Sequence, residues 1–327
     1  ERDWSVRLSV LKILNILAAE RLGALQQAVL CSAQGLARLM DVLNDSREII
    51  RNEVLLVMVA LTKGNTEVQK IMAFEGAFDT LFGIVKEEEE GSIILVDCLI
   101  IINNLLHGNP SNATFFREMA GVSQHILPLL QRPIVGGPGW EQRWTHLLDV
   151  IGSLLSPPEA LQSAQTTLGK QGVLLAVAEA CTSKVISKAA KAASLRMLGV
   201  LCHKHTPNRI TLSTYAAKCD GVPLLHHLLA ACLHERTQRD DPAHEVNAAA
   251  AFFWKCYLSG NVDGQQHLAA TLMPQPIFDD DFGGEGGGGP AASVLPIGRI
   301  LISSLMVANE ADARRIADGD PGAAARL

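Results

Sequence analysis

The chain has 327 residues and a formal net charge of −6, and 48% of its residues are hydrophobic but only 5% aromatic. The prevalence of Leu and Ala over aromatic residues argues against a β-sandwich and favours helices packed on helices. An acidic chain without a basic stripe is poorly suited to neutralise phosphates, so nucleic acid is excluded as the expected partner.

Six long helices are predicted from the apolar periodicity, at residues 4–19, 46–62, 92–107, 140–155, 184–203 and 243–258. The second and third are apolar on nearly all sides, so each must be covered by neighbours in several directions. Gly-Asn pairs follow three of the long helices, at Gly64-Asn65, Gly108-Asn109 and Gly260-Asn261. Glycine can end a helix in a left-handed conformation and asparagine can cap the next one, so these repeated breaks indicate internal duplication.

Short apolar helices are predicted to open at glycines that recur 41, 45, 51 and 49 residues apart, namely Gly35, Gly76, Gly121, Gly172 and Gly221. A period of this size is typical of armadillo and HEAT repeats. We therefore expect an all-α, right-handed superhelical solenoid of armadillo/HEAT type. Such a fold has extended surfaces rather than one central cavity, which favours binding of other macromolecules.

Two stretches interrupt the array. Residues 132–139 are predicted to form an inserted loop, and the glycine- and aspartate-rich residues 274–293 a flexible insert. The acidic run 87–90 is interpreted as a solvated loop. The predicted domains are an array of five to six units over 1–273, the insert over 274–293, and terminal helices of the array over 294–327. We expect apolar surface at the open C-terminal end, where 294–307 would pair with another copy or continue into further repeats.

The cysteines and apolar runs indicate a cytoplasmic protein without a transmembrane segment. The seven cysteines lie singly, with no CxxC pair, as expected for reduced thiols. The longest apolar run, Ile93–Leu106, is interrupted by Asp97, Asn103 and Asn104 and is too short to span a bilayer. Because the chain starts without methionine and is helical almost at once, it is expected to be part of a longer protein.

The sequence gives no motif for catalysis. The richest cluster of metal-type ligands, between Cys202 and His234, offers one suitable pair, Cys202 and His205, but no second pair. The glycines at 283–289 follow no strand and precede no GK[ST], unlike a phosphate loop. No nucleophile elbow is present. We expect no enzyme activity, cofactor or metal.

Residues 45–118 carry a more specific pattern. In order, they contain DSREIIRN from Asp45, QKIMAFEGAF from Gln69, DCL from Asp97, NLL from Asn104 and NPSNATFFRE from Asn109. This pattern resembles the globular head of the general vesicular transport factor family, which are golgin-type tethers. The likeness covers the first third of the chain in detail; the rest follows the same architecture with a weaker likeness between residues.

The resemblance implies a head with armadillo-like repeats, followed in the family by a long coiled coil that would lie beyond Leu327. Its members are homodimers that tether transport vesicles to Golgi membranes. They work with a Rab-type small GTPase, SNARE proteins and other tethering factors in ER-to-Golgi and intra-Golgi transport. By this resemblance the chain would be peripherally associated with Golgi and vesicle membranes through its partners.

Candidate partner-binding residues come from the polar part of this pattern and from two tryptophans: Arg47, Arg51, Asn52, Gln69, Lys70, Glu75, Asn104, Trp140 and Trp144. Lys70 and Arg51 are long and charged, which favours contacts toward solvent, whereas Asp97 lies in an apolar helix and is expected to be satisfied internally. For the other polar residues, capping and hydrogen bonds between repeats are the competing interpretation. Trp140 and Trp144 share a helix face, where a core role is favoured over a partner anchor.

A peptide-groove armadillo adaptor, of the nuclear-import or signalling type, is the alternative function. Such proteins repeat Trp and Asn along successive inner helices to hold an extended peptide. The candidates here are asparagines 15, 52, 103, 104 and 247 and tryptophans 4, 140, 144 and 254. These residues do not recur together at one helix position, which disfavours the alternative.

Overall fold

The computed structural model describes residues 2–32, 34–156, 158–219, 221–233 and 242–270, and all that follows concerns these residues. The expected insert at 274–293 and terminal helices at 294–327 lie outside them. The helices are α1 (Arg2–Cys31), α2 (Gly35–Val42), α3 (Glu48–Thr62), α4 (Thr66–Phe74), α5 (Ala77–Glu87), α6 (Ile93–Leu106), α7 (Pro110–Glu118), α8 (Leu127–Leu130), α9 (Pro138–Leu154), α10 (Leu161–Lys170), α11 (Val173–Thr182), α12 (Lys188–Cys202), α13 (Thr206–Ser213), α14 (Leu224–Leu233), α15 (Pro242–Leu258) and α16 (Val262–Ala270). A π-helical turn, η1 (Val122–Ile126), precedes α8, and a 3-10 turn, η2 (Pro158–Ala160), precedes α10.

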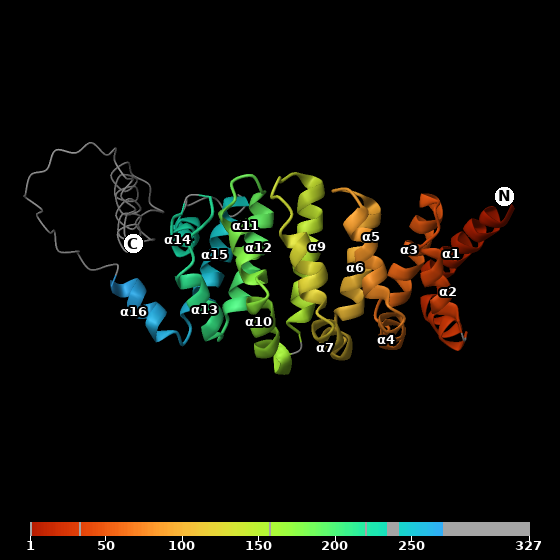
Figure 1. The fold of residues 1–327 in the computed structure, drawn as a ribbon, viewed down its shortest axis with the longest axis horizontal. Helices are drawn as coiled ribbons and strands as arrows, with labels where there is room; N and C mark the ends of the chain where they lie inside the picture. Colours follow the sequence, from red (N-terminus) through yellow and green to blue (C-terminus); the bar gives the residue numbers. More distant parts are fainter. Residues whose placement is uncertain (1, 33, 157, 220, 234–241, 271–327) are drawn as a thin grey trace, which may run out of the picture.

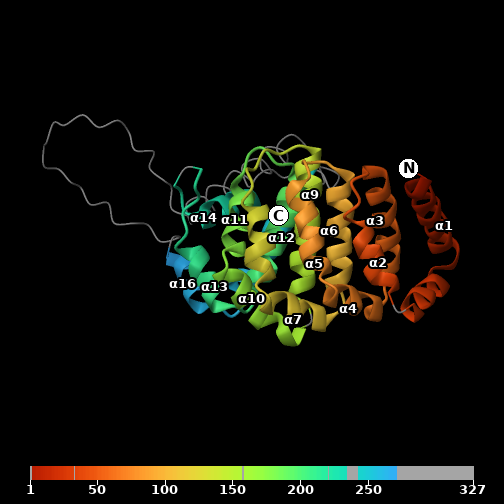
Figure 2. The same ribbon diagram turned by 45° about the vertical axis from the view of Figure 1, so that its right-hand side comes forward.

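The helices stack into an elongated array in chain order, as Figure 1 shows from α1 at one end to α16 at the other. Each long helix packs on the next along the series α1, α3, α6, α9, α12 and α15. The short helices α4, α7, α10, α13 and α16 run along one edge, which Figure 2 shows from a second direction. The only strand-like pairing in the described part of the chain is one bridge between Ala216 and Pro223. The fold is thus all-α, as the sequence predicts.

The long helices form the core. Helix α6 buries nine of its 14 residues, and α3 buries seven of its 15. The prediction that these two helices are covered on several sides is confirmed, because each is enclosed by two long neighbours and by the short helices of its own unit. The helix expected at 4–19 corresponds to the first segment of α1, which is broken at Arg21 (φ −144°, ψ 50°); a second helical segment follows to Cys31.

The repeated Gly-Asn breaks have one geometry. Gly64, Gly108 and Gly260 all take φ near +65°, and the asparagine after each accepts a hydrogen bond from a backbone N–H of the following helix. After α12, Lys204 (φ 52°) and His205 occupy the same two places, and His205 Nδ1 accepts from the Asn208 N–H at 3.3 Å. The turn geometry of the repeat is therefore kept after α12, although the Gly-Asn pair is absent from the sequence there.

Three of the glycines that recur before the short helices, Gly76, Gly121 and Gly172, are required for two different reasons. Gly76 and Gly172 have φ values of 82° and 89° and provide the left-handed residue before α5 and α11. Gly121 has an ordinary helical φ of −56°. A Cβ there would lie 2.5 Å from the Phe116 ring, so this glycine is needed for close packing.

Side chains of one unit bond the end of the long helix in the next. The last carbonyls of a helix lack partners within it, and buried ones need a donor from elsewhere. Four donors supply this need: Gln26 to the carbonyls of Leu61 and Lys63, Arg117 to Leu154, Gln165 to Val200 and His203, and Arg209 to Cys256 and Ser259. These bonds fix each unit against its neighbour.

The acidic run at 87–90 is not simply solvated. Arg143, with a side chain only 1% exposed, donates from Nε to the Glu90 carboxylate at 2.7 Å and from Nη1 to the Leu129 carbonyl at 2.7 Å. Arg132, in the predicted loop, donates to the carbonyls of Val85 and Lys86. The solvated-loop interpretation is therefore wrong for Glu90, which ties α9 to the end of α5.

No single helix in the described residues is long and apolar enough to cross a membrane. The pair α6 and α7 satisfies the criteria of length and composition together, but it is bent by 111° at its break. Helix α6 is also the core helix described above, with most of its apolar side chains against other helices.

Candidate protein-binding surface

Gln69 is an internal residue rather than a surface contact. It is buried on α4, donates from Nε2 to the Thr62 carbonyl at 2.9 Å, and accepts from Asn109 Nδ2 at 3.1 Å. Asn112 Nδ2 donates to the Gln69 carbonyl at 3.0 Å. These bonds join α4 to α7, so the structure contradicts a partner-binding role for the Gln69 side chain.

Asn104 also joins repeats. From α6 its Nδ2 donates to the Val59 carbonyl at 3.3 Å and to Thr62 Oγ1 at 3.1 Å, both on α3. The side chain is half-buried, and both of its amide protons are used within the array. The competing interpretation, hydrogen bonding between units, is the correct one for the Asn104 amide.

Trp140 and Trp144 belong to the core. They are 1% and 0% exposed, their rings stack with centroids 5.0 Å apart, and Trp144 Nε1 donates to Ser194 Oγ at 2.9 Å. Their i, i+4 spacing brings them together, but on the inner side of α9 and against α12. An exposed partner-anchor role is therefore wrong for both.

Three of the predicted residues are on the surface. Lys70 and Glu75 are exposed on and just after α4, where Lys70 Nζ forms a 3.2 Å ion pair with Glu67. Arg47, before α3, lies 3.4 Å from Asp45 and has its guanidinium carbon 5.8 Å from the centre of the Trp4 ring. The Lys70–Glu67 pair is exposed on both sides and contributes little to stability, so Lys70 and Glu75 are available for other contacts. Arg47 is exposed but already contacts Trp4 and the Asp45 carboxylate, whose side chain is only 5% exposed.

Arg51 and Asn52 are half-buried on α3, and each has a buried polar atom, Arg51 Nε and Asn52 Oδ1, without a hydrogen-bond partner in the described structure. On the adjoining long helices, burial raises the pKa of Asp97 on α6 and of Asp149 on α9, while the charge of His146 opposes both shifts. The side chain of Asp97 forms no hydrogen bond in the described part, so the expectation of internal satisfaction is wrong. Asp149 lies 3.7 Å from His146, so the polar groups without a partner in the described structure are Arg51 Nε and Asn52 Oδ1 on α3 and the carboxyl of Asp97 on α6.

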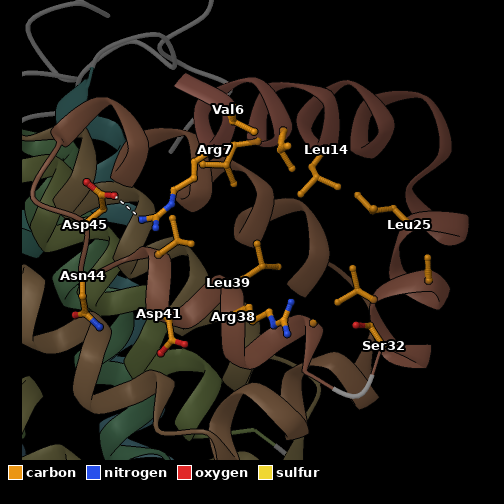
Figure 3. A pocket seen from close by; sticks show the side chains of 16 residues that line it. Val6, Arg7, Leu14, Leu25, Ser32, Arg38, Leu39, Asp41, Asn44 and Asp45 are labelled. Carbon is orange, nitrogen blue, oxygen red and sulfur yellow. Dashed lines mark hydrogen bonds and ion pairs between the residues drawn. The ribbon is translucent and has the colours of Figure 1, made fainter. Parts of the chain in front are cut away.

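A cavity of about 870 Å³ opens at the N-terminal end of the array between α1 and α2 (Figure 3). Leu14, Leu25 and Leu39 line it, and the Arg7–Asp45 ion pair at 3.3 Å closes one edge. Further apolar side chains of α1 are exposed beside it, including Val10 at 48%. We expected such an open end at 294–307, which lies outside the described residues; this apolar end is formed by α1.

The histidine–cysteine region forms no metal site in the described residues, where no three His, Cys, Asp or Glu side chains could hold an ion. Cys202 is buried, and burial raises the pKa of its thiol. His205 caps α13 through Nδ1 and contacts Thr166 Oγ1 through Nε2 at 2.9 Å. These contacts give both residues structural roles.

Two buried histidines are expected to make stability depend on pH. Burial lowers the pKa of His125 from its ordinary 6.5, and the charge of Lys86 adds to this, against the opposing effect of Asp79. Burial and the charge of Arg209 lower the pKa of His205 in the same way. Below pH 6.5 the unfolded chain therefore binds protons that the folded chain does not. The stability contributed by these neutral imidazoles is complete above that pH and is lost as the pH falls below it.

We expect the urea midpoint of the chain to be lower at about pH 5.5 than at about pH 7.5, and the variant His125→Gln to show a smaller difference. The raised pKa values of Asp97 and Asp149 have the opposite effect on stability, which they lower as the pH rises above the ordinary value of 3.8. Both residues are present in both proteins, so their contribution cancels in the comparison. Urea titrations of the two proteins at both pH values measure the effect. An equal difference in both would contradict it.

No protein-family model matches the sequence. The general vesicular transport factor p115 of Homo sapiens is 32% identical over 293 residues, covering 85% of this chain and 29% of that protein. Golgin candidate 6 of Arabidopsis thaliana is 32% identical over 294 residues, covering 84% of this chain and 31% of that protein. The chain spans about a third of the length of these relatives.

Two solved structures share the fold. A crystal structure of Uso1 (Uso1-1) superposes with a TM-score of 0.74 at 24% identity, covering 82% of this chain and 44% of that one. A designed armadillo repeat protein in complex with the peptide (KR)4 superposes with a TM-score of 0.56 at 17% identity, covering 76% of this chain and 92% of that one. The named relatives are transport factors and a golgin rather than enzymes, in agreement with the prediction of a non-enzymatic chain.

Proposed function

This chain is a homologue of the head region of the p115/Uso1 general vesicular transport factors, and on that premise we propose that it is a protein-binding scaffold in vesicle tethering. It would act in ER-to-Golgi and intra-Golgi transport, peripherally associated with Golgi and vesicle membranes. Its partners would be a Rab-type small GTPase, SNARE proteins and other tethering factors. In the full-length protein it would be part of a homodimer.

The observation that carries this proposal is that some polar side chains of the family pattern form hydrogen bonds between repeats, whereas others remain exposed to solvent. Gln69 and Asn104 are used to join repeats, whereas Lys70 and Glu75 are exposed and make at most one solvent-screened ion pair; Arg47 is exposed and contacts Asp45 and Trp4. Donors such as Arg209 hold each unit rigidly against the next. A partner would therefore meet a preformed surface, and little conformational entropy would be lost in ordering the scaffold.

The proposal predicts that the chain retains a Rab-type GTPase in one nucleotide state more strongly than in the other. The experiment is a pull-down with a panel of small GTPases, each loaded with GDP or with a non-hydrolysable GTP analogue. The double variant Arg47→Glu, Lys70→Glu tests the exposed cations, and Lys63→Glu on an exposed turn is the matched control.

Retention of no GTPase, together with tight capture of a nuclear-localisation peptide, would favour the peptide-groove adaptor instead. That alternative requires tryptophans on the groove face, and Trp140, Trp144 and Trp254 are all buried. Homodimerisation is tested separately by light scattering of the chain at low and high concentration. A constant monomer mass would limit the dimer contacts to other parts of the full-length protein.

A further inference from the structure

The edge formed by the short helices carries an apolar patch that the fold does not use. Phe74, at the end of α4, is 86% exposed, and Phe115 on α7 and Ile71 on α4 are 44% and 39% exposed. Large apolar side chains grouped on a surface are typical of binding sites, whereas single ones are ordinary. We call these three residues the α4–α7 patch.

The two helices are held in a fixed register. Asn65 and Asn109 cap α4 and α7 in the same way, so that Ile71 and Phe115 are both the sixth residue of their helix. Asn109 and Asn112 at the start of α7 bond the side chain and the carbonyl of Gln69 on α4. Both views show α4 and α7 next to each other along the lower edge (Figures 1 and 2).

Neighbouring residues show that the exposure is specific. Phe116 is fully buried, with its ring 4.8 Å from that of Phe78 and 5.8 Å from that of Phe82. Packing therefore requires an aromatic residue at 116 but not at 115. In α13, which begins at Thr206, the sixth residue is Thr211, an exposed polar residue. The sixth position is thus apolar in α4 and α7 but polar in α13, where the exposed apolar residue is instead the fifth, Ile210.

The α4–α7 patch is bordered by exposed carboxylates and by a small cavity. Lys70 pairs with Glu67, which leaves Glu75 and Glu118 exposed without an ion pair in the described structure. Beside Ile71 and Glu75, a cavity of about 160 Å³ opens between α4 and the facing ends of α1 and α2. Its volume is close to that of the engineered cavity of about 150 Å³ that holds benzene, so it has room for one apolar side chain.

We propose that the α4–α7 patch binds an amphipathic helix of a partner protein, whose apolar stripe is flanked by Lys or Arg. Two parallel ridges of helix with exposed aromatic residues suit a helix laid across them, with anchors at i, i+3 or i+4, and i+7. The unpaired carboxylates of Glu75 and Glu118 select basic flanks, and they repel an anionic membrane surface. The inference deepens the proposed function by naming the chemistry of one partner, but its test does not depend on any GTPase.

The test uses two synthetic helical peptides with the same leucine stripe, one with Lys and Arg flanks and one with Glu flanks, labelled for fluorescence anisotropy. We expect the basic peptide to bind and the acidic one to bind at least tenfold more weakly. The variant Phe74→Ser, Phe115→Ser should weaken binding of the basic peptide at least tenfold. The variant Glu75→Lys, Glu118→Lys should reverse the preference between the two peptides.

The matched control is Ile210→Ser, which removes an exposed apolar side chain (59%) from α13, outside the patch. It should bind the basic peptide as the unaltered chain does, and circular dichroism should show the same melting curve for all variants. The proposal is overturned if the basic peptide fails to bind at millimolar concentration, or if Phe74→Ser, Phe115→Ser binds it unchanged. A dimer in light scattering that Phe74→Ser, Phe115→Ser dissolves would also overturn it, since the patch would then be occupied by a second copy.

Discussion

Replacing Trp144 by alanine is expected to lower the free energy of unfolding by about 3–5 kcal/mol, the range for removing a large aromatic side chain from a core. Trp144 is fully buried between the units of α9 and α12, stacks on Trp140, and donates to Ser194. The variant leaves a cavity and also leaves the Ser194 hydroxyl without this donor. A partner anchor on the surface would instead affect binding with little change in stability.

Urea denaturation followed by circular dichroism measures the loss. Trp144→Phe keeps most of the ring but removes the N–H, so it should cost about 1–3 kcal/mol. Trp4→Ala is the control, because Trp4 is 36% exposed and its contact is an outer one with Arg47. A change below about 1 kcal/mol for Trp144→Ala, or an equal change for Trp4→Ala, would show that Trp144 is not part of the stabilising core.

Replacing Glu90 by glutamine is expected to cost about 3 kcal/mol, toward the lower end of the range for leaving a buried charge unpaired, since the Glu90 side chain is 32% exposed. The Arg143 guanidinium is almost fully buried, and its Nη2 already has no hydrogen-bond partner in the described structure. Glutamine keeps one acceptor oxygen but no negative charge, so the guanidinium would retain neutral hydrogen bonds, including that to the Leu129 carbonyl, and would lose its counter-ion.

Two further variants separate the charge from the packing. Glu89→Gln, on an exposed neighbour, should change the free energy of unfolding by less than about 0.5 kcal/mol. In the double variant Glu90→Gln, Arg143→Met, the buried charge is absent, so part of the stability lost in Glu90→Gln should return. Equal stability of Glu90→Gln and the unaltered chain would mean that the ion pair does not anchor α9.

The repeat architecture could be predicted because its signals are local. Apolar periodicity gives α3 and α6, and the Gly-Asn breaks give the turns that follow them, since a left-handed residue and a cap depend on the residues themselves. Where the local signal changes, prediction fails: nothing in Lys204-His205 indicates that it adopts the same turn. The end predicted for the first long helix, at residue 19, lies close to Arg21, whose non-helical backbone divides α1 into two segments.

The sequence shows the residue type of each candidate contact residue but does not show whether its side chain is exposed. Gln69 and Lys70 are adjacent in sequence, yet one joins α4 to α7 and the other faces solvent. A rotation of 100° per residue along the helix separates them, and which side is covered depends on where the next unit packs. The exposed Phe115 was missed for the same reason, because it is chemically identical to the buried Phe116 beside it.

By itself, the sequence determined that the chain consists of repeated helices, which of them are innermost, and which family it resembles, because these properties follow from residue type and spacing. The tertiary structure alone decided which polar side chains are consumed in joining one unit to the next and which apolar ones stay uncovered. The physical reason is that a carbonyl at the end of α15 and its donor Arg209, 47 residues away from Cys256, meet only after the units have stacked.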